Sequence, residues 1–156
     1  MVTIGDLMRE CRNYFERGGM DGTFTITTSG RITGAEALGA VNGQYVAIRG
    51  SAMNDGVYQI DKTGKLSQGE DIELDFAPET FSGRIWLLFP PRAFVALVQS
   101  ANEIEAMNPK GGMIHESFGE YSYTKATGKD GAPMTWQQAL HASLAPYKRI
   151  LSQIGV

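Results

Sequence analysis

The chain has 156 residues, yet it contains a single cysteine and only two histidines. Cys11 has no second cysteine with which to form an internal disulfide, and it falls on the apolar stripe of the first predicted helix, so we expect a buried thiol. His115 and His141 have no metal-ligand or acid–base partner at a recognisable spacing. We therefore expect no metal, no cofactor and no enzymatic activity.

Long apolar runs and clustered positive charge are lacking as well. No apolar run approaches the roughly 18 residues of a membrane span. The first residues show no basic region followed by an apolar stretch, as a secretory signal would require. The formal net charge is -3 with scattered Lys and Arg, which disfavours a protein that mainly grips phosphates. We expect a chain that folds in the cytoplasm and does not bind membranes.

Three weak chemical signals have simpler structural explanations. Residues 115–117, His-Glu-Ser, contain the types needed for a nucleophile and a base, but sequence neighbours cannot all point at one atom. Residues 64–65, Gly-Lys, resemble the end of a phosphate loop, but Leu66 stands where a hydroxyl is required. The acids of the segment 71–76 lack the loop that would wrap a calcium ion. We interpret that segment as the solvated face of a strand.

A short amphipathic helix is predicted at the start of the chain. Thr3 is placed to cap it, Asp6 follows three residues later, and apolar residues recur at helical spacing up to Phe15. The sequence Arg-Gly-Gly at 17–19 is typical of a helix end.

The period of the apolar residues changes from 3.6 to 2 between Gly22 and Phe89, which predicts strands. They are expected around 24–26, 45–48, 57–60, 71–76 and 84–89, with turns at 54–56 and 62–64. In 71–76 three acids alternate with Ile72, Leu74 and Phe76, so one face should be solvated. A single helical turn is expected within 34–41.

Two further helices are predicted in the second half. Pro90 and Pro91 suit a helix start, and an apolar stripe runs from Phe94 to Met107. The last helix begins with a capping box around Thr135 and carries its apolar stripe to Ile154, with a bend expected at Pro146. Residues 121–124 read as a short strand-like piece.

The resulting fold class is α+β: a small bundle of three main helices with a β-rich insertion between the first and second long helices. The predicted helical core comprises residues 1–20 and 90–156, and the inserted subdomain comprises 21–89. Aromatic residues serve both cores and interfaces, and for Trp136 we favour core packing.

Three stretches resemble phage and prophage head-to-tail connector proteins. They are residues 45–58 (YVAIRGSAMNDGVY), the Phe-Pro-Pro helix start at 89–91, and residues 116–123 (ESFGEYSY) with the loop into Trp136. With their connecting helices they cover about two thirds of the chain. The third is the most specific, and the first is typical of a variant with an inserted β-domain.

The resemblance implies a non-enzymatic virion subunit at the head–tail junction. It implies a homo-oligomeric ring, dodecameric in the virion, that docks under the portal protein after DNA packaging and presents a surface to the next neck or tail protein. DNA would pass through the lumen without specific binding. The adaptable contact segment would be 116–128, and the residues expected at the interface are Glu116, Ser117, Phe118, Gly119, Tyr121, Ser122, Tyr123 and Thr124.

Two alternatives remain open at this point. Within the phage class, the chain could be a tail-completion or capsid-accessory protein. In a different class, the β-rich part could be a small module that binds a carbohydrate or a nucleic acid on exposed aromatic side chains. The few basic residues between Gly22 and Phe89 weaken nucleic acid as the ligand.

Overall fold

The computed structural model describes residues 1–69, 72–107 and 134–149. The chain divides into two compact units, which we call the helical unit (Met1–Asn13 with Pro91–Val156) and the barrel unit (Tyr14–Pro90). We predicted subdomains of 1–20 with 90–156 and of 21–89. Whether these behave as subdomains stays a prediction, and the first strand of the barrel crosses the boundary at residue 20.

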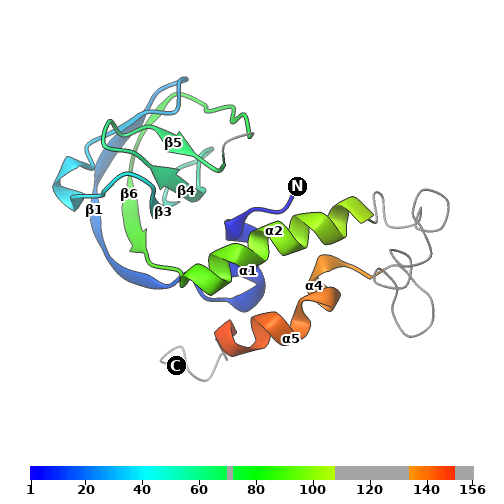
Figure 1. Cartoon of the computed structure of the whole chain (residues 1–156). Coiled ribbons are helices and arrows are strands. Elements are labelled where there is room, and N and C mark those ends of the chain that lie inside the picture. Colours follow the sequence, from blue (N-terminus) through cyan, green and yellow to red (C-terminus); the bar gives the residue numbers. More distant parts are fainter. Residues whose placement is uncertain (70–71, 108–133, 150–156) are drawn as a thin grey trace. The chain divides into compact units, whose positions relative to one another are not determined.

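The barrel unit is a six-stranded antiparallel sheet that nearly closes on itself (Figure 1). Its strands are β1 (Glu16–Ile26), β2 (Ile32–Thr33), β3 (Gln44–Arg49), β4 (Gly56–Ile60), β5 (Leu66–Ser67) and β6 (Glu79–Leu88), with a 3-10 turn, η1, at Glu36–Leu38. Their order in the sheet is β2-β1-β6-β3-β4-β5. The long strands β1 and β6 are paired over most of their length and curve together around the unit.

The two ends of the sheet meet beside β2 and β5. Arg31 and Lys65 form an antiparallel bridge there. The amide of Ile32 donates to the carbonyl of Gly64 at 2.9 Å, and the amide of Leu66 donates to the carbonyl of Gly30 at 2.8 Å. This contact pairs backbone groups that an open sheet would leave free at its edges.

Alternating residues of the strands fill the barrel. In β1 the side chains of Phe24 and Ile26 are fully buried. Thr23 and Thr25, which alternate with them, lie on the outer face, where their hydroxyls hydrogen-bond to those of Ser82 and Thr80 of β6, respectively. The core cluster consists of Phe24, Ile26, Ile32, Ala35, Val46, Ile48, Tyr58, Ile60, Leu66, Phe76, Phe81 and Ile85. Burial of these side chains is the main stabilising contribution within the unit.

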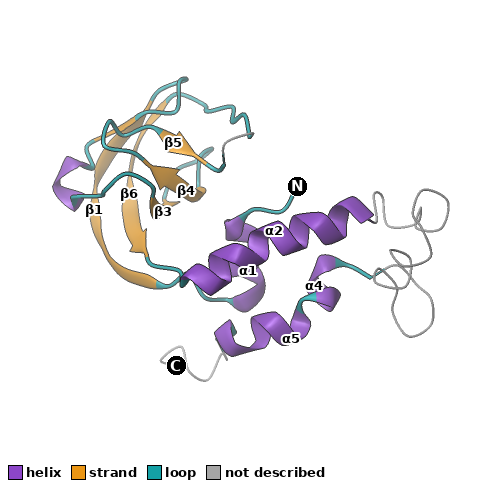
Figure 2. Ribbon diagram, in the orientation of Figure 1, coloured by secondary structure: helices purple, strands orange, loops and turns teal. Residues whose placement is uncertain are grey.

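Within its described residues, the helical unit contains one long helix and several small ones (Figure 2). They are α1 (Ile4–Cys11), α2 (Arg92–Met107), α4 (Trp136–Ala139), α5 (His141–Leu144) and a 3-10 turn, η3 (Ala145–Tyr147). Phe94 of α2 is fully buried and packs edge-to-face on Tyr147, with 5.1 Å between the ring centroids. The predicted buried thiol is confirmed, since Cys11 is 1% exposed, and burial raises its pKa.

The predicted α+β bundle of three main helices is wrong. The described chain is mostly β, a near-barrel of six strands with one long helix, α2, and small helices. Residues 16–20, expected at the end of the first helix, belong to β1, because the helix ends at Arg12 in a left-handed conformation (φ 53°). The expected long last helix breaks at Leu140 (φ -98°, ψ 10°), ahead of the predicted bend at Pro146.

Several local predictions are confirmed. The capping boxes at Thr3 and Thr135, the proline-initiated helix, the helical turn within 34–41 and four of the five strands are present. The fifth, 71–76, is no strand within its described residues. Its side chains alternate as expected, with Glu73 and Asp75 exposed and Phe76 buried, but no neighbouring strand pairs with its backbone.

The loop between β3 and β4 bonds to the backbone at the end of this segment, in the place of a neighbouring strand. Gly50 adopts a positive φ of 99° at the end of β3. The buried side chain of Asn54 donates to the carbonyl of Ala77 at 2.8 Å and accepts from its amide at 3.3 Å. An asparagine amide thus occupies both backbone groups of Ala77, as a neighbouring strand would.

Candidate functional site

The predicted contact residues, from Glu116 to Thr124, lie outside the described residues. The proposed adaptable segment 116–128 and the group at 115–117 lie there too. Among the described residues, no group of three His, Cys, Asp and Glu side chains is placed to hold a metal ion. His141 is exposed at the start of α5, with Nδ1 3.4 Å from Nζ of Lys148.

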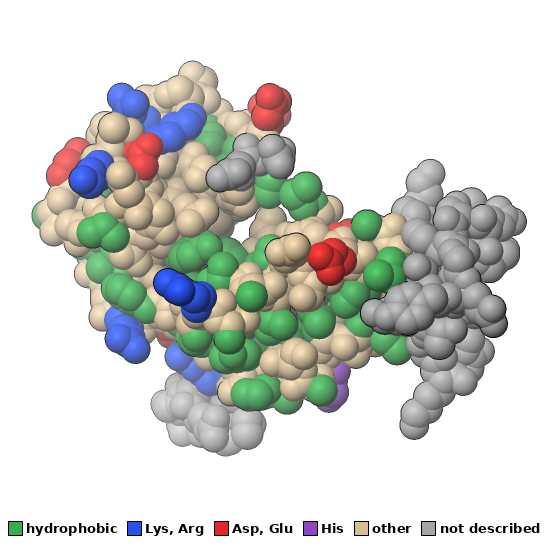
Figure 3. All heavy atoms as spheres, in the orientation of Figure 1, with side chains coloured by type: hydrophobic (Ala, Val, Ile, Leu, Met, Phe, Trp, Pro, Cys, Tyr) green, Lys and Arg blue, Asp and Glu red, His purple; other side chains and the backbone are tan. Residues whose placement is uncertain are grey.

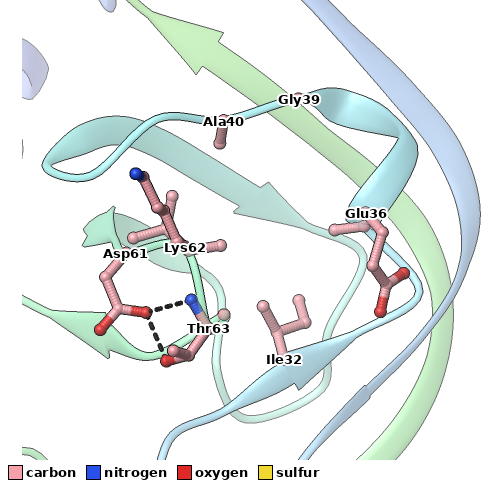
Figure 4. A pocket seen from close by; sticks show the side chains of 10 residues that line it. Ile32, Glu36, Gly39, Ala40, Asp61, Lys62 and Thr63 are labelled. Atoms are coloured by element: carbon pink, nitrogen blue, oxygen red, sulfur yellow. Dashed lines mark hydrogen bonds between the residues drawn. The ribbon is translucent and has the colours of Figure 1, made fainter.

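One pocket lies between η1 and the turn after β4 (Figure 4). Its two carboxylates, Asp61 and Glu36, lie on opposite sides and are occupied by their own turns. Asp61 accepts from the amide and the hydroxyl of Thr63 at 2.8 and 2.6 Å, and Glu36 accepts from the amide of Gly34. Both carboxylates accept hydrogen bonds within their own turns, so their presence in the pocket is explained by the structure of these turns.

A second hollow, of about 280 Å³, lies in the helical unit beside Trp136. Trp136 is half-buried rather than part of the core. Asp6, which also lines the hollow, is engaged in the capping box of α1 and lies 3.5 Å from Arg9. The acid that lines this hollow is therefore already engaged in capping a helix.

The third hollow lies on the outer face of the barrel and has a different composition. It has a volume of about 220 Å³ and is lined by Tyr14, Glu16, Ala47, Arg49, Trp86 and Leu88. Together with the neighbouring Arg84 we call these residues the arginine–aromatic face. It is the strongest candidate site in the described part of the chain.

Strand register builds this face. Trp86 of β6 pairs with Gly19 of β1 on one side and with Ala47 of β3 on the other. A side chain at Gly19 would place its Cβ 2.5 Å from the carbonyl oxygen of Ile85. The close approach at Gly19 admits no side chain there, and the small side chain of Ala47 lines the hollow beside Trp86.

Two arginines stand in the next row of the same face. Arg49 of β3 and Arg84 of β6 are direct cross-strand partners, so their side chains leave the sheet about 5 Å apart. The guanidinium of Arg84 lies 4.1 Å from the ring centroid of Trp86, and that of Arg49 lies 5.2 Å from the ring of Tyr14. Each cation therefore lies over an aromatic ring, which orients it.

The hydrogen bonds and the ion pair of Arg49 and Arg84 use only some of the N–H donors of the two guanidinium groups. Arg84 Nη1 lies 3.0 Å from a carboxylate oxygen of the exposed Asp21, but its buried Nε has no partner within the described chain. Arg49 donates one bond to the carbonyl of Ile48. A guanidinium offers five N–H donors in a planar fork that suits carboxylates.

The arrangement can bind but has no evident chemistry of its own. Trp, Tyr and Arg are the residue types that dominate the binding energy of protein interfaces. On the face shown in Figure 3 the Lys and Arg side chains form separate groups with acidic side chains among them. None of Trp86, Arg49 and Arg84 was predicted as a site residue, because the register that brings them together is set by strands far apart in sequence.

The comparisons with known proteins add no family. No protein-family model matches the chain, and no curated protein or solved structure is significantly similar to it. Within the described residues, no helix is both long and apolar enough to cross a membrane.

Proposed function

We propose that the chain is a structural subunit of a tailed phage, joining the portal and head to the neck or tail through protein–protein contacts. The observation that carries the proposal is the arginine–aromatic face, where Trp86, Tyr14 and Arg49 line an open hollow and Arg84 lies over the ring of Trp86. Such a group provides large contact area and oriented charge, which are the properties of an interface anchor.

The sequence resemblance supplies the class of assembly. The stretch 45–58 corresponds to β3, the following loop and β4, and the helix start at 89–91 leads into α2. The predicted bundle of three main helices is not found in the described chain, so this proposal places the contact surface on the barrel. The segment 116–128 remains a second proposed contact.

The assembly is proposed to be a homo-oligomeric ring in the virion at the head–tail junction. Its neighbours would be the portal protein and the next neck or tail protein, and DNA would pass through without specific binding. A role as a tail-completion or capsid-accessory protein would use the same kind of contact surface with other partners.

The test is association with the portal protein encoded in the same genome. We expect the full chain to co-sediment with the portal protein, and Trp86→Ala to weaken this association at least about tenfold, as for an aromatic hot spot. Thr80→Ala, on the same outer face of β6 but away from the hollow, is the matched control. Equal binding by Trp86→Ala and wild type would exclude this face as the contact.

A small ligand-binding module is the second candidate, because the hollow places an indole and a phenol ring where a sugar or a base could stack. Titration of the protein with oligosaccharides and with single-stranded DNA distinguishes the two functions. A change in Trp fluorescence that saturates with one of these ligands and is lost in Trp86→Ala would favour the module.

A further inference from the structure

The barrel unit also carries a segment with the opposite charge. Residues 72–76 follow β5 and precede β6, and within them Glu73 and Asp75 are exposed while Phe76 is buried. The aromatic ring of Phe76 packs on Tyr58, with 5.7 Å between the centroids. The segment is therefore anchored by its apolar side chains and presents its acids to solvent.

The backbone of this segment is available for bonding. Within the described chain, the amides and carbonyls of residues 73–76 take part in no hydrogen bond, whereas those of the next residue, Ala77, are both bonded by Asn54. Neither Glu73 nor Asp75 forms an ion pair with a described residue. Charged side chains and unpaired backbone thus coincide in one short segment.

The spacing of charges on the two surfaces is similar. Glu73 and Asp75 are two residues apart on the same side of the segment, and in an extended chain this is about 7 Å. Arg49 and Arg84 are cross-strand partners about 5 Å apart at their Cβ atoms. Long guanidinium side chains easily accommodate the difference, so two carboxylate–guanidinium pairs can form together.

The two surfaces also match in shape and polarity. The arginine–aromatic face is hollowed, and the aromatic residues of its lining, Tyr14 and Trp86, are partly exposed. In the acidic segment the half-buried Leu74 packs against the core of its own barrel, so the segment presents the two carboxylates on either side of it. A pair of exposed carboxylates suits a hollow beside which arginines are held over aromatic rings.

We propose that the arginine–aromatic face of one copy of this chain receives the segment 72–76 of a second copy. Glu73 and Asp75 bind Arg49 and Arg84, while Leu74 stays packed against the core of its own barrel. The proposal rests on the proposed function, for which it names the contact between neighbouring subunits.

This contact joins two different patches of the same chain. Such a heterologous interface leaves one free patch of each kind at the ends of every oligomer, so it propagates until a ring closes or a filament grows. It therefore differs in kind from a two-fold dimer contact, which would consume both patches at once.

The experiment uses complementary charge reversals in the full-length chain. Arg49→Glu and Asp75→Arg are each expected to weaken self-association at least about tenfold in sedimentation velocity, measured with and without the portal protein of the same genome. Rising salt should weaken the wild-type association, because the contact is between charges near the surface.

Mixing the two variants tests directly whether the two patches contact each other. In the mixture, the reversed face of Arg49→Glu meets the reversed segment of Asp75→Arg, and the remaining wild-type patches meet each other. We expect oligomers to return in the equimolar mixture although neither variant forms them alone. Arg92→Glu and Glu103→Arg, both exposed on α2, are the charge-matched controls and should assemble as wild type, alone and mixed.

The outcomes separate this inference from the proposed function. If wild type assembles with the portal protein but both reversals also assemble normally, or if the mixture fails to restore assembly, the docking of 72–76 is wrong while the proposed function stands. Failure of the wild type to associate either with itself or with the portal protein overturns both. Circular dichroism spectra that match wild type confirm that the variants are folded.

Discussion

The barrel unit and the helical unit are stabilised in different ways. In the barrel, β1 pairs with β6 across some sixty residues of sequence, from Glu16 with Leu88 to Ile26 with Glu79, and one continuous cluster of side chains fills the interior. In the helical unit, capping boxes at Thr3 and Thr135 begin α1 and α4. A smaller set of apolar side chains from separate helices is buried there: Leu7, Met8, Cys11, Phe94, Ala101, Leu140 and Leu144.

The difference determines how firmly each unit positions the side chains on its surface. A closed sheet holds every strand between two neighbours, so side chains on its outer face stand in fixed rows. Short helices joined by caps constrain their surfaces less, since each cap contributes only about 1 kcal/mol. A surface that must present two arginines at a set spacing is therefore better built on the barrel.

The largest expected effect compares one core phenylalanine in each unit. Phe24 and Phe94 are both fully buried, so Phe24→Ala and Phe94→Ala should each destabilise its own unit by about 3 to 5 kcal/mol. Hydrogen exchange resolved by residue should show lost protection in the barrel for the first variant and in the helical unit for the second. Equal loss in both units for either variant would contradict two separately stabilised units.

A smaller effect is expected where two strands approach closely. A Cβ at Gly83 would lie 2.2 Å from the carbonyl oxygen of Arg49. Gly83→Ala should therefore push β3 from β6 and destabilise the barrel by about 1 to 3 kcal/mol. Denaturant unfolding measures it, with Ser82→Ala on the exposed face of β6 as the control. A neutral Gly83→Ala would mean that the β3–β6 register differs from the one described.

Removing a helix cap from the helical unit should lower the free energy of unfolding by a smaller amount. The hydroxyl of Thr135 accepts from the amide of Gln138 at 3.2 Å. Thr135→Ala removes this bond and should cost about 1 kcal/mol, whereas Thr135→Ser should cost little. Chemical unfolding followed by helix circular dichroism compares the pair. Identical midpoints for both variants would show that the cap is unimportant for α4.

The smallest expected effect concerns the pH dependence of a barrel turn. Hydrogen bonds from Thr63 and Lys65 lower the pKa of the exposed Asp61. A carboxyl whose folded pKa lies below its unfolded value stabilises the protein above the unfolded pKa, and this contribution is lost as the pH falls through the folded pKa. Stability measured down the acid range should fall less steeply in Asp61→Asn than in wild type. Parallel pH profiles would contradict this role of Asp61.

The elements of the fold were predictable where their signals are local. Thr3 and Thr135 identify helix starts, and the alternation around Phe24 identifies β1. The extent of β1 was missed because Gly18 and Gly19 are typical of a helix end, yet here they lie in a strand opposite Leu87 and Trp86. Pairing with β6, which a local pattern does not reveal, outweighs that preference.

The same limit applies to the candidate site. Tyr14, Arg49 and Trp86 belong to separate segments of the sequence, and only the order β1-β6-β3 brings them to one face. The segment 71–76 shows the opposite error. Its alternation predicted a strand, and its described side chains alternate in burial, but a strand also needs a partner, and periodicity carries no information about one.

We propose that this chain works by assembling through its surfaces. Native mass measurement of the purified chain, with and without the portal protein encoded in the same genome, tests it most directly. We expect a complex that contains many copies of the chain on the portal protein, and fewer copies with Trp86→Ala. A chain that remains monomeric and unbound at every ratio of the two proteins would contradict it.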